Sequence, residues 1–180
     1  MITIAALVMA ALVGGLLIYA ATRADTFRVE RHVVINRRPA DIFPLLEDFH
    51  RWVDWSPWEE LDPALRRTYG GADRGKGAIY EWEGNNKVGK GHMEIIRIES
   101  PTHLTIDLSF IRPFKAENAA AFDLEPQGSG TEVTWAMYGP LPFASKLMSM
   151  FVSMDGIIGK DFEKGLARLK TAAERSVATA

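Results

Sequence analysis

The chain has 180 residues, of which 47% are apolar and 24% charged, and its 23 acidic and 21 basic side chains give a formal net charge of −2. This balance excludes the large basic surface with which nucleic-acid-binding proteins neutralise phosphates, so we expect no nucleic-acid partner. The chain has no cysteine, which excludes disulfides, thiolate metal sites and a cysteine nucleophile.

The first 22 residues carry no charged side chain. As a helix they would span roughly 30 Å, the hydrocarbon thickness of a bilayer. Tyr19 stands where an interfacial aromatic residue is expected, and Arg23 ends the apolar run. We therefore predict an uncleaved transmembrane anchor over residues 1–22, followed by a short linker over residues 23–25.

Two alternatives for this segment stay open. A cleaved signal peptide would need a basic amino-terminal region, which is absent, and a better cleavage site than Thr22-Arg23-Ala24. A buried core helix would need a polar face, and the segment has none. Ala10/Gly14 and Ala11/Gly15 are pairs of small residues that would permit weak self-association of two spans.

Basic residues flank the apolar segment on one side only. Five arginines follow it closely and none precedes it (Arg23, Arg28, Arg31, Arg37 and Arg38). By the positive-inside rule, we expect the anchor in the cytoplasmic membrane and the rest of the chain in the cytoplasm.

Residues 26–35 alternate between apolar and polar side chains, which predicts a half-buried strand. In residues 39–49 a proline precedes apolar residues at helical spacing, which predicts a short helix. Three of the five tryptophans follow within residues 51–58.

From residue 66 to 139 the pattern has period two, interrupted by short turn sequences rich in glycine, proline and asparagine. Short connections between alternating runs predict antiparallel hairpins, because parallel strands need long crossovers. The alternation slips between Ile95 and Ile96, which predicts a β-bulge and a curved sheet.

After Pro142 the apolar period becomes helical. One face of a long predicted helix carries Leu147, Phe151, Met154, Ile158, Phe162, Leu166, Leu169 and Ala173. Gly156 and Gly159 are expected to weaken or bend the middle of this helix. We therefore predict an α+β domain over residues 26–175, a curved antiparallel sheet wrapped around one long C-terminal helix, with a disordered tail over residues 176–180.

Several motifs together carry a family resemblance. They are Val29-x-Arg31-x-Val33-x-Ile35, the run from Pro39 to Phe49, Trp52-x-x-Trp55-Ser56-Pro57-Trp58, Tyr80-Glu81-Trp82-Glu83-Gly84-Asn85, Val88-Gly89-Lys90-Gly91, and the run from Gly159 to Lys170. They resemble the SRPBCC (START-like, Bet v 1-like) superfamily, and within it the bacterial polyketide cyclase/dehydrase branch, over residues 26–174.

The resemblance implies a helix-grip fold with a deep apolar cavity between the sheet and the C-terminal helix. Members of this branch often carry an N-terminal membrane span. The resemblance supplies no catalytic motif that can be transferred residue by residue, so catalytic residues stay unassigned.

Motifs for cofactors and metals are weak. Residues 70–77 approach a phosphate-binding loop, but Gly77 replaces the Ser/Thr that holds magnesium and a strand follows instead of a helix. The four histidines lack zinc-ligand spacing, and the acidic cluster Glu59, Glu60 and Asp62 lacks the glycine of a calcium loop. His92 and Glu94 share a strand face, where a solvated surface is favoured over an acid–base pair. We expect no cofactor and no metal.

Aromatic and methionine side chains are the remaining signal. Their number exceeds what a small core requires, and large aromatic walls with adaptable methionines suit an apolar ligand cavity. The candidate lining residues are Trp55, Trp58, Tyr80, Trp82, Phe110, Phe122, Trp135, Met137, Phe151 and Met154. Each of them taken singly would equally suit a packed core.

Three functions are compatible with these features. The first is a membrane-anchored module that binds a lipid-like or polycyclic hydrophobic molecule. The second is an enzyme of the polyketide cyclase/aromatase type, and an inward-facing histidine or carboxylate with a strongly shifted pKa would favour it. The third is a tethered interaction domain without a ligand, which would have a filled core.

Overall fold

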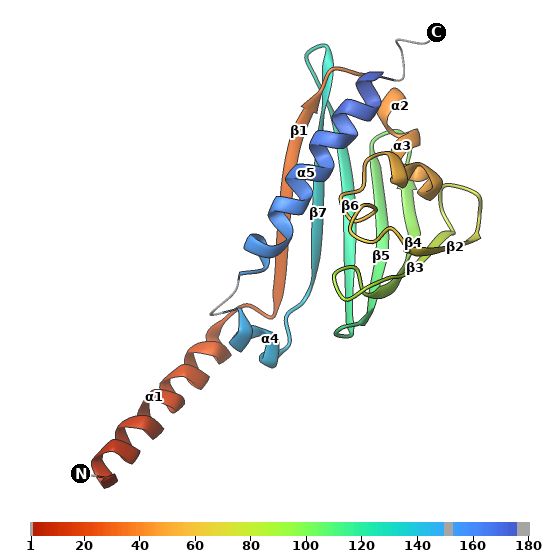
Figure 1. The fold of residues 1–180 in the computed structure, drawn as a ribbon. Coiled ribbons are helices and arrows are strands. Elements are labelled where there is room, and N and C mark those ends of the chain that lie inside the picture. Colours follow the sequence, from red (N-terminus) through yellow and green to blue (C-terminus); the bar gives the residue numbers. More distant parts are fainter. Residues whose placement is uncertain (1, 150–152, 176–180) are drawn as a thin grey trace.

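The structure, a computed structural model, describes residues 2–149 and 153–175. The predicted tail over residues 176–180 lies outside them. The elements in chain order are α1 (Ile2–Thr22), β1 (Thr26–Ile35), α2 (Pro39–Ile42), α3 (Pro44–Glu47), the 3-10 helix η1 (Phe49–Asp54), β2 (Arg66–Gly71), β3 (Ala78–Glu83), β4 (Lys90–Glu99), β5 (His103–Arg112), β6 (Ala116–Gln127), β7 (Gly130–Pro140), α4 (Phe143–Met148) and α5 (Met154–Arg175) (Figure 1).

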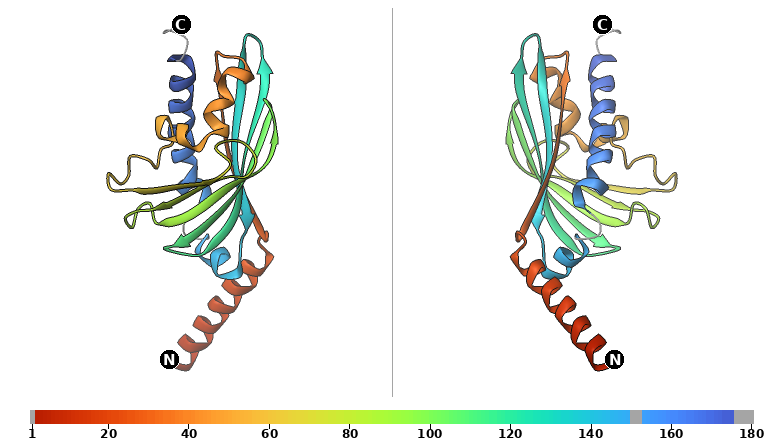
Figure 2. Two further views of the ribbon diagram at one scale, coloured as in Figure 1. Left: turned by 90° about the vertical axis from the view of Figure 1, so that its right-hand side faces the viewer. Right: turned by 90° about the vertical axis from the view of Figure 1, so that its left-hand side faces the viewer.

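The seven strands form one antiparallel sheet in the order β1-β7-β6-β5-β4-β3-β2. The predicted bulge is confirmed, because the β4–β5 register shifts between Ile95 and Arg97. A bulge increases local twist and bends the strand that carries it. The sheet curves around α5, and α2, α3 and η1 cover the same face (Figure 2). This arrangement confirms the predicted α+β helix-grip fold.

The tryptophan-rich motif fixes the short helices onto the sheet. The indole N–H groups of Trp52 and Trp55 donate to the carbonyl oxygens of Leu46 and Leu45, at 3.1 and 3.0 Å. Both indoles are buried, and the ring of Trp55 packs edge-on against Phe122 at 5.9 Å. Buried indole N–H groups need such partners, which makes η1 part of the core rather than a loose connection.

The predicted single helix after Pro142 is wrong, because the structure has two helices. Just after α4 ends, the hydroxyl of Ser149 donates to the carbonyl oxygen of Lys146 at 2.7 Å. Ser153 accepts from the N–H of Gly156 at 2.8 Å and so caps the start of α5. Gly156 and Gly159 therefore lie in the first turns of α5 and not in the middle of a helix.

Gly159 serves close packing rather than bending. A Cβ there would overlap the guanidinium group of Arg31, which reaches across from β1. Arg31 pairs with Asp155 at 2.7 Å and with Glu163 at 2.8 Å. These two ion pairs tie the first turns of α5 to the edge of the sheet.

The helix α1 extends away from the domain (Figure 1). Its last turn meets α4 at a packed joint. Lys146 of α4 has a buried side chain, and its ammonium group donates to the carbonyl oxygen of Arg23 at 2.8 Å and pairs with Asp25 at 2.5 Å. The backbone N–H of Leu141 also donates to the carbonyl oxygen of Asp25, at 2.6 Å.

Candidate ligand cavity

A cavity of about 450 Å³ lies between the curved sheet, α5 and the segment after η1. This volume falls within the range of small-molecule binding sites. Most of its lining is apolar: Trp52, Trp58, Leu65, Trp82, Val88, Met93, Leu108, Phe110, Pro113, Phe114, Ala116, Ala120, Trp135, Met137, Met154, Ile157, Ile158 and Phe162. The polar members of the lining are Ser56, Glu59, Tyr80, Lys87, Asn118 and Asp161.

The structure brings most of the predicted lining residues together. Those that line the cavity are Trp58, Tyr80, Trp82, Phe110, Trp135, Met137 and Met154. Phe151 lies outside the described residues. Their function as ligand contacts stays a proposal.

Trp55 and Phe122 do not line the cavity, and here the expectation needs correction. Both side chains are completely buried in the layer beneath the wall. Phe122 stacks on Trp135 with ring centroids 5.0 Å apart, and Trp135 in turn stacks on Phe162 at 4.0 Å. Alternation along a strand reports which face a residue lies on, but it does not report whether another side chain covers it.

Gly91 provides space for one wall of the cavity. A Cβ at this position would overlap the Trp82 ring and the carbonyl oxygen of Ser109. The Trp82 ring therefore lies against Gly91 of β4, and its N–H donates to the carbonyl oxygen of Val88, just before that strand, at 3.2 Å. Trp82 also packs edge-on against Phe110 at 5.7 Å, so β3, β4 and β5 share one aromatic wall.

Glu59 is an acidic residue of the cavity lining that contacts Tyr80 of this wall. Its side chain is only 8% exposed and accepts from the Tyr80 hydroxyl at 2.7 Å and from Arg67 at 2.6 Å. Burial, assisted by the hydrogen bond to Glu59, raises the pKa of Tyr80 well above its usual range. Tyr80 thus remains a protonated donor at physiological pH.

Sequence reasoning missed Glu59 as a lining residue because it read three neighbouring carboxylates as one cluster. In the structure the three carboxylates have different partners. Glu60 pairs with Arg168 of α5, whereas Asp62 accepts from the backbone N–H groups of Ala64 and Asn85. The aromatic residues around Glu59 are the only signal in the sequence that it faces an apolar interior.

None of the four histidines belongs to the cavity lining. His103 instead bonds to Asp123 at 2.6 Å and Thr105 at 2.8 Å, and His50 stacks on Tyr69 at 4.1 Å. Across the part of the chain that the structure describes, no group of His, Asp and Glu side chains is arranged to hold a metal ion.

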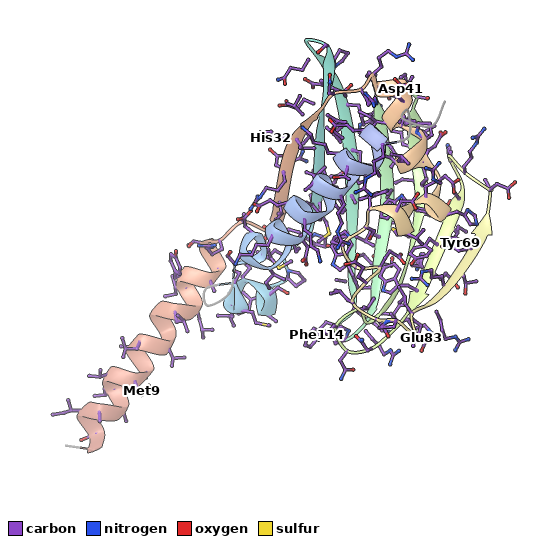
Figure 3. All side chains as sticks on the ribbon, turned by 45° about the horizontal axis from the view of Figure 1, so that its top comes forward. Met9, His32, Asp41, Tyr69, Glu83 and Phe114 are labelled. Carbon is purple, nitrogen blue, oxygen red and sulfur yellow. The ribbon has the colours of Figure 1, made fainter. Side chains whose placement is uncertain are left out.

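The cavity reaches the surface at the end of the domain from which α1 leaves. Phe114, in the β5–β6 turn, is 76% exposed, and Ile157 of α5 is 54% exposed. Both line the cavity, as does the exposed Lys87. Phe114 lies at the end of the sheet nearer α1 (Figure 3), and α4 lies at that same end (Figure 1).

This fold and site define a helix-grip domain with an internal apolar cavity. The family described as polyketide cyclase / dehydrase and lipid transport matches residues 26–174. The chain belongs to this family, which confirms the SRPBCC resemblance. No curated protein matches the sequence.

Solved structures share the fold at low sequence identity. A protein from Rhizobium leguminosarum is 13% identical with a TM-score of 0.61, over 86% of this chain and 98% of that one. The Aha1 dimer from Colwellia psychrerythraea is 15% identical with a TM-score of 0.57, over 84% and 98%. DynU16, from the dynemicin biosynthetic locus, is 16% identical with a TM-score of 0.55, over 85% of this chain and 48% of that one.

One helix in the described residues, Thr3–Thr22, is long and apolar enough to cross a membrane. Only 6% of its apolar window is buried inside the structure, so it is not a core helix of this domain. A signal sequence near the N-terminus passes the same test of length and hydropathy.

Proposed function

We propose that this protein is a membrane-anchored module that binds a hydrophobic, lipid-like or polycyclic molecule in its cavity. The observation that carries the proposal is the apolar cavity of about 450 Å³, whose mouth lies at the end of the domain from which α1 leaves. A filled core, as a tethered interaction domain would have, leaves no such space.

The anchor and the cavity are linked by the joint at Lys146. Because α4 holds the start of β1 through Asp25 and Arg23, the mouth keeps its position relative to the end of α1. With α1 in a bilayer, a membrane-dissolved ligand would be held at high effective concentration near the mouth. The arginines after the span favour an anchor in the cytoplasmic membrane with the domain on the cytoplasmic side. The pairs of small residues in α1 would permit weak self-association of two spans.

Binding is favoured over catalysis by the polar groups of the lining. A general acid or base works best with a pKa near the operating pH. The pKa of Tyr80 is shifted upward, away from that range, mainly by burial. The histidines lie elsewhere, and Glu59 already accepts from Tyr80 and Arg67. These groups suit recognition of a ligand better than proton transfer.

Titration with N-phenyl-1-naphthylamine tests the proposal on the full chain held in amphipol. All five tryptophans belong to the soluble domain, so energy transfer from tryptophan to the probe reports binding there. We expect saturable binding by the wild type. Ala120→Leu, which adds bulk inside the cavity, should weaken it about tenfold or more.

The matched control is Ala119→Leu, one residue earlier on β6 and therefore on the opposite face of the sheet. It should bind as the wild type does. Absence of saturable binding to the wild type, or equal affinity of the wild type and Ala120→Leu, would contradict the proposal.

A further inference from the structure

Four cavity-lining residues form one row across the sheet. The register pairs Tyr80 with Met93, Met93 with Leu108, and Leu108 with Asn118, on β3, β4, β5 and β6. Neighbouring strands lie just under 5 Å apart, so the row is about 14 Å long measured along the sheet. Its two ends are polar and its two middle members are apolar.

Asn118 forms one polar end. The residue is 9% exposed, yet its side-chain amide makes no hydrogen bond within the described residues. Its Oδ1 packs onto Gly139, where a Cβ would overlap it. Buried amides are nearly always hydrogen-bonded. Since Asn118 is part of the cavity lining, its amide is free to bond to a molecule in the cavity.

Tyr80 and Glu59 form the other polar end. Glu59 accepts one hydrogen bond on each oxygen, from Tyr80 on Oε1 and from Arg67 on Oε2. A carboxylate has about four acceptor positions, so Glu59 retains capacity for an O–H or N–H group of a ligand. Arg67 balances its charge, which allows the carboxylate to stay in an apolar wall.

We propose that the cavity selects an elongated apolar molecule with a hydrogen-bonding group at each end. A hydroxyl at one end donates to Glu59 beside Tyr80, and a hydroxyl or carbonyl at the other end bonds to the amide of Asn118. Met93 and Leu108 contact the apolar middle. This inference rests on the proposed function and adds the polarity and length of the ligand.

A series of α,ω-alkanediols, each compared with the 1-alkanol of equal length, tests the inference. Tryptophan fluorescence of the full chain in amphipol reports binding, because Trp58, Trp82 and Trp135 line the cavity. The ratio of diol affinity to alkanol affinity removes the general effect of chain length. We expect this ratio to be highest near ten carbons, because the extended ten-carbon diol is about as long as the row. The ratio at ten carbons should exceed the ratios at six and fourteen carbons about threefold or more.

Asn118→Leu should remove the peak while the 1-alkanols and N-phenyl-1-naphthylamine still bind. Ala119→Leu, next to Asn118 on β6 but on the opposite face of the sheet, should keep it. A wild-type ratio without a peak, in a protein that binds the naphthylamine probe, would overturn the inference and leave the proposed function standing. Failure of that probe to bind would overturn both.

Discussion

Trp135 belongs to the cavity lining and to the core at the same time. It is 2% exposed, stacks on Phe162 and Phe122, and meets Trp55 and Trp58 edge-on at 5.4 and 5.5 Å. The sequence places it on the inward face of a strand, but only the packing shows how many rings surround it. A single residue on that face can thus support both the fold and a binding site.

Substitution of two tryptophans separates these contributions. Trp135→Ala should lower the free energy of unfolding by about 3–5 kcal/mol, because it removes a ring packed on several sides. Trp58 is only half-buried, so Trp58→Ala should cost less, about 1–2 kcal/mol, while still weakening probe binding. Urea unfolding measures both changes. Equal losses for the two variants would contradict this division.

Gly91 permits an aromatic wall that alternation alone does not predict. Gly91→Ala should lower the free energy of unfolding by about 1–3 kcal/mol, because its Cβ would overlap Trp82 and backbone of β5. Gly70→Ala on β2 is the matched control, since a Cβ there meets only Ile79 at an ordinary 4.0 Å. Thermal unfolding followed by circular dichroism compares them, and a larger loss for the Gly70 variant would refute the explanation.

At the scale of elements, α5 is held by charged groups as well as by its apolar face. Arg31 pairs with Asp155 and Glu163, and Arg168 pairs with Glu60. The hydrogen bond from Arg31 lowers the pKa of Asp155, and the one from Arg168 lowers the pKa of Glu60. Both carboxylates are exposed, so their contribution is small and screened by salt.

The sign of the pH dependence follows from these lowered pKa values. A carboxylate whose pKa is lower in the folded state stabilises the fold above its unfolded pKa, and this stabilisation is lost as the pH falls through the folded pKa. We expect the midpoint temperature of thermal unfolding to decrease as the pH is lowered below about 4. The Asp155→Asn/Glu60→Gln double variant should lose less stability over that range than the wild type. A parallel pH profile for the two proteins would contradict this.

Most elements follow from local patterns, and the exceptions have physical causes. Alternation predicts the strands and the Ile95 bulge because each depends on which face a residue occupies. The break between α4 and α5 depends on hydrogen bonds of the Ser149 and Ser153 side chains with nearby backbone groups. The apolar residues keep their helical spacing across this break, so their pattern does not predict it. The sequence does not identify Glu59 and Asn118 as cavity residues, because a single polar residue there leaves the spacing of the apolar residues unchanged.

At the scale of the whole molecule, α1 as a membrane anchor would bring the mouth of the cavity next to the bilayer. Phe114 and Ile157 at the rim, and Phe143 and Met148 on α4, are exposed large apolar side chains at this end. Exposed apolar groups that gather on one surface mark an interaction site. A rim in contact with lipid would let a ligand pass between bilayer and cavity without crossing water.

A single fluorescent label tests this orientation, because the chain has no cysteine of its own. Phe114→Cys carrying a nitrobenzoxadiazole label should show a blue-shifted emission when the full chain is in liposomes, and brominated lipids should quench it. Gln127→Cys, at the β6–β7 turn on the opposite end of the domain (Figure 1), should remain in water. Equal emission from the two labelled positions would contradict the orientation.

The central claim is that the cavity holds a hydrophobic molecule, and native mass spectrometry of the purified full chain, released from detergent, tests it most directly. We predict a population of one protein with one small molecule, and loss of that population in Ala120→Leu but not in Ala119→Leu. Extraction with organic solvent should then yield an apolar compound from the wild type. A wild-type spectrum with only the mass of the bare chain, and the same spectrum for both variants, would contradict the account.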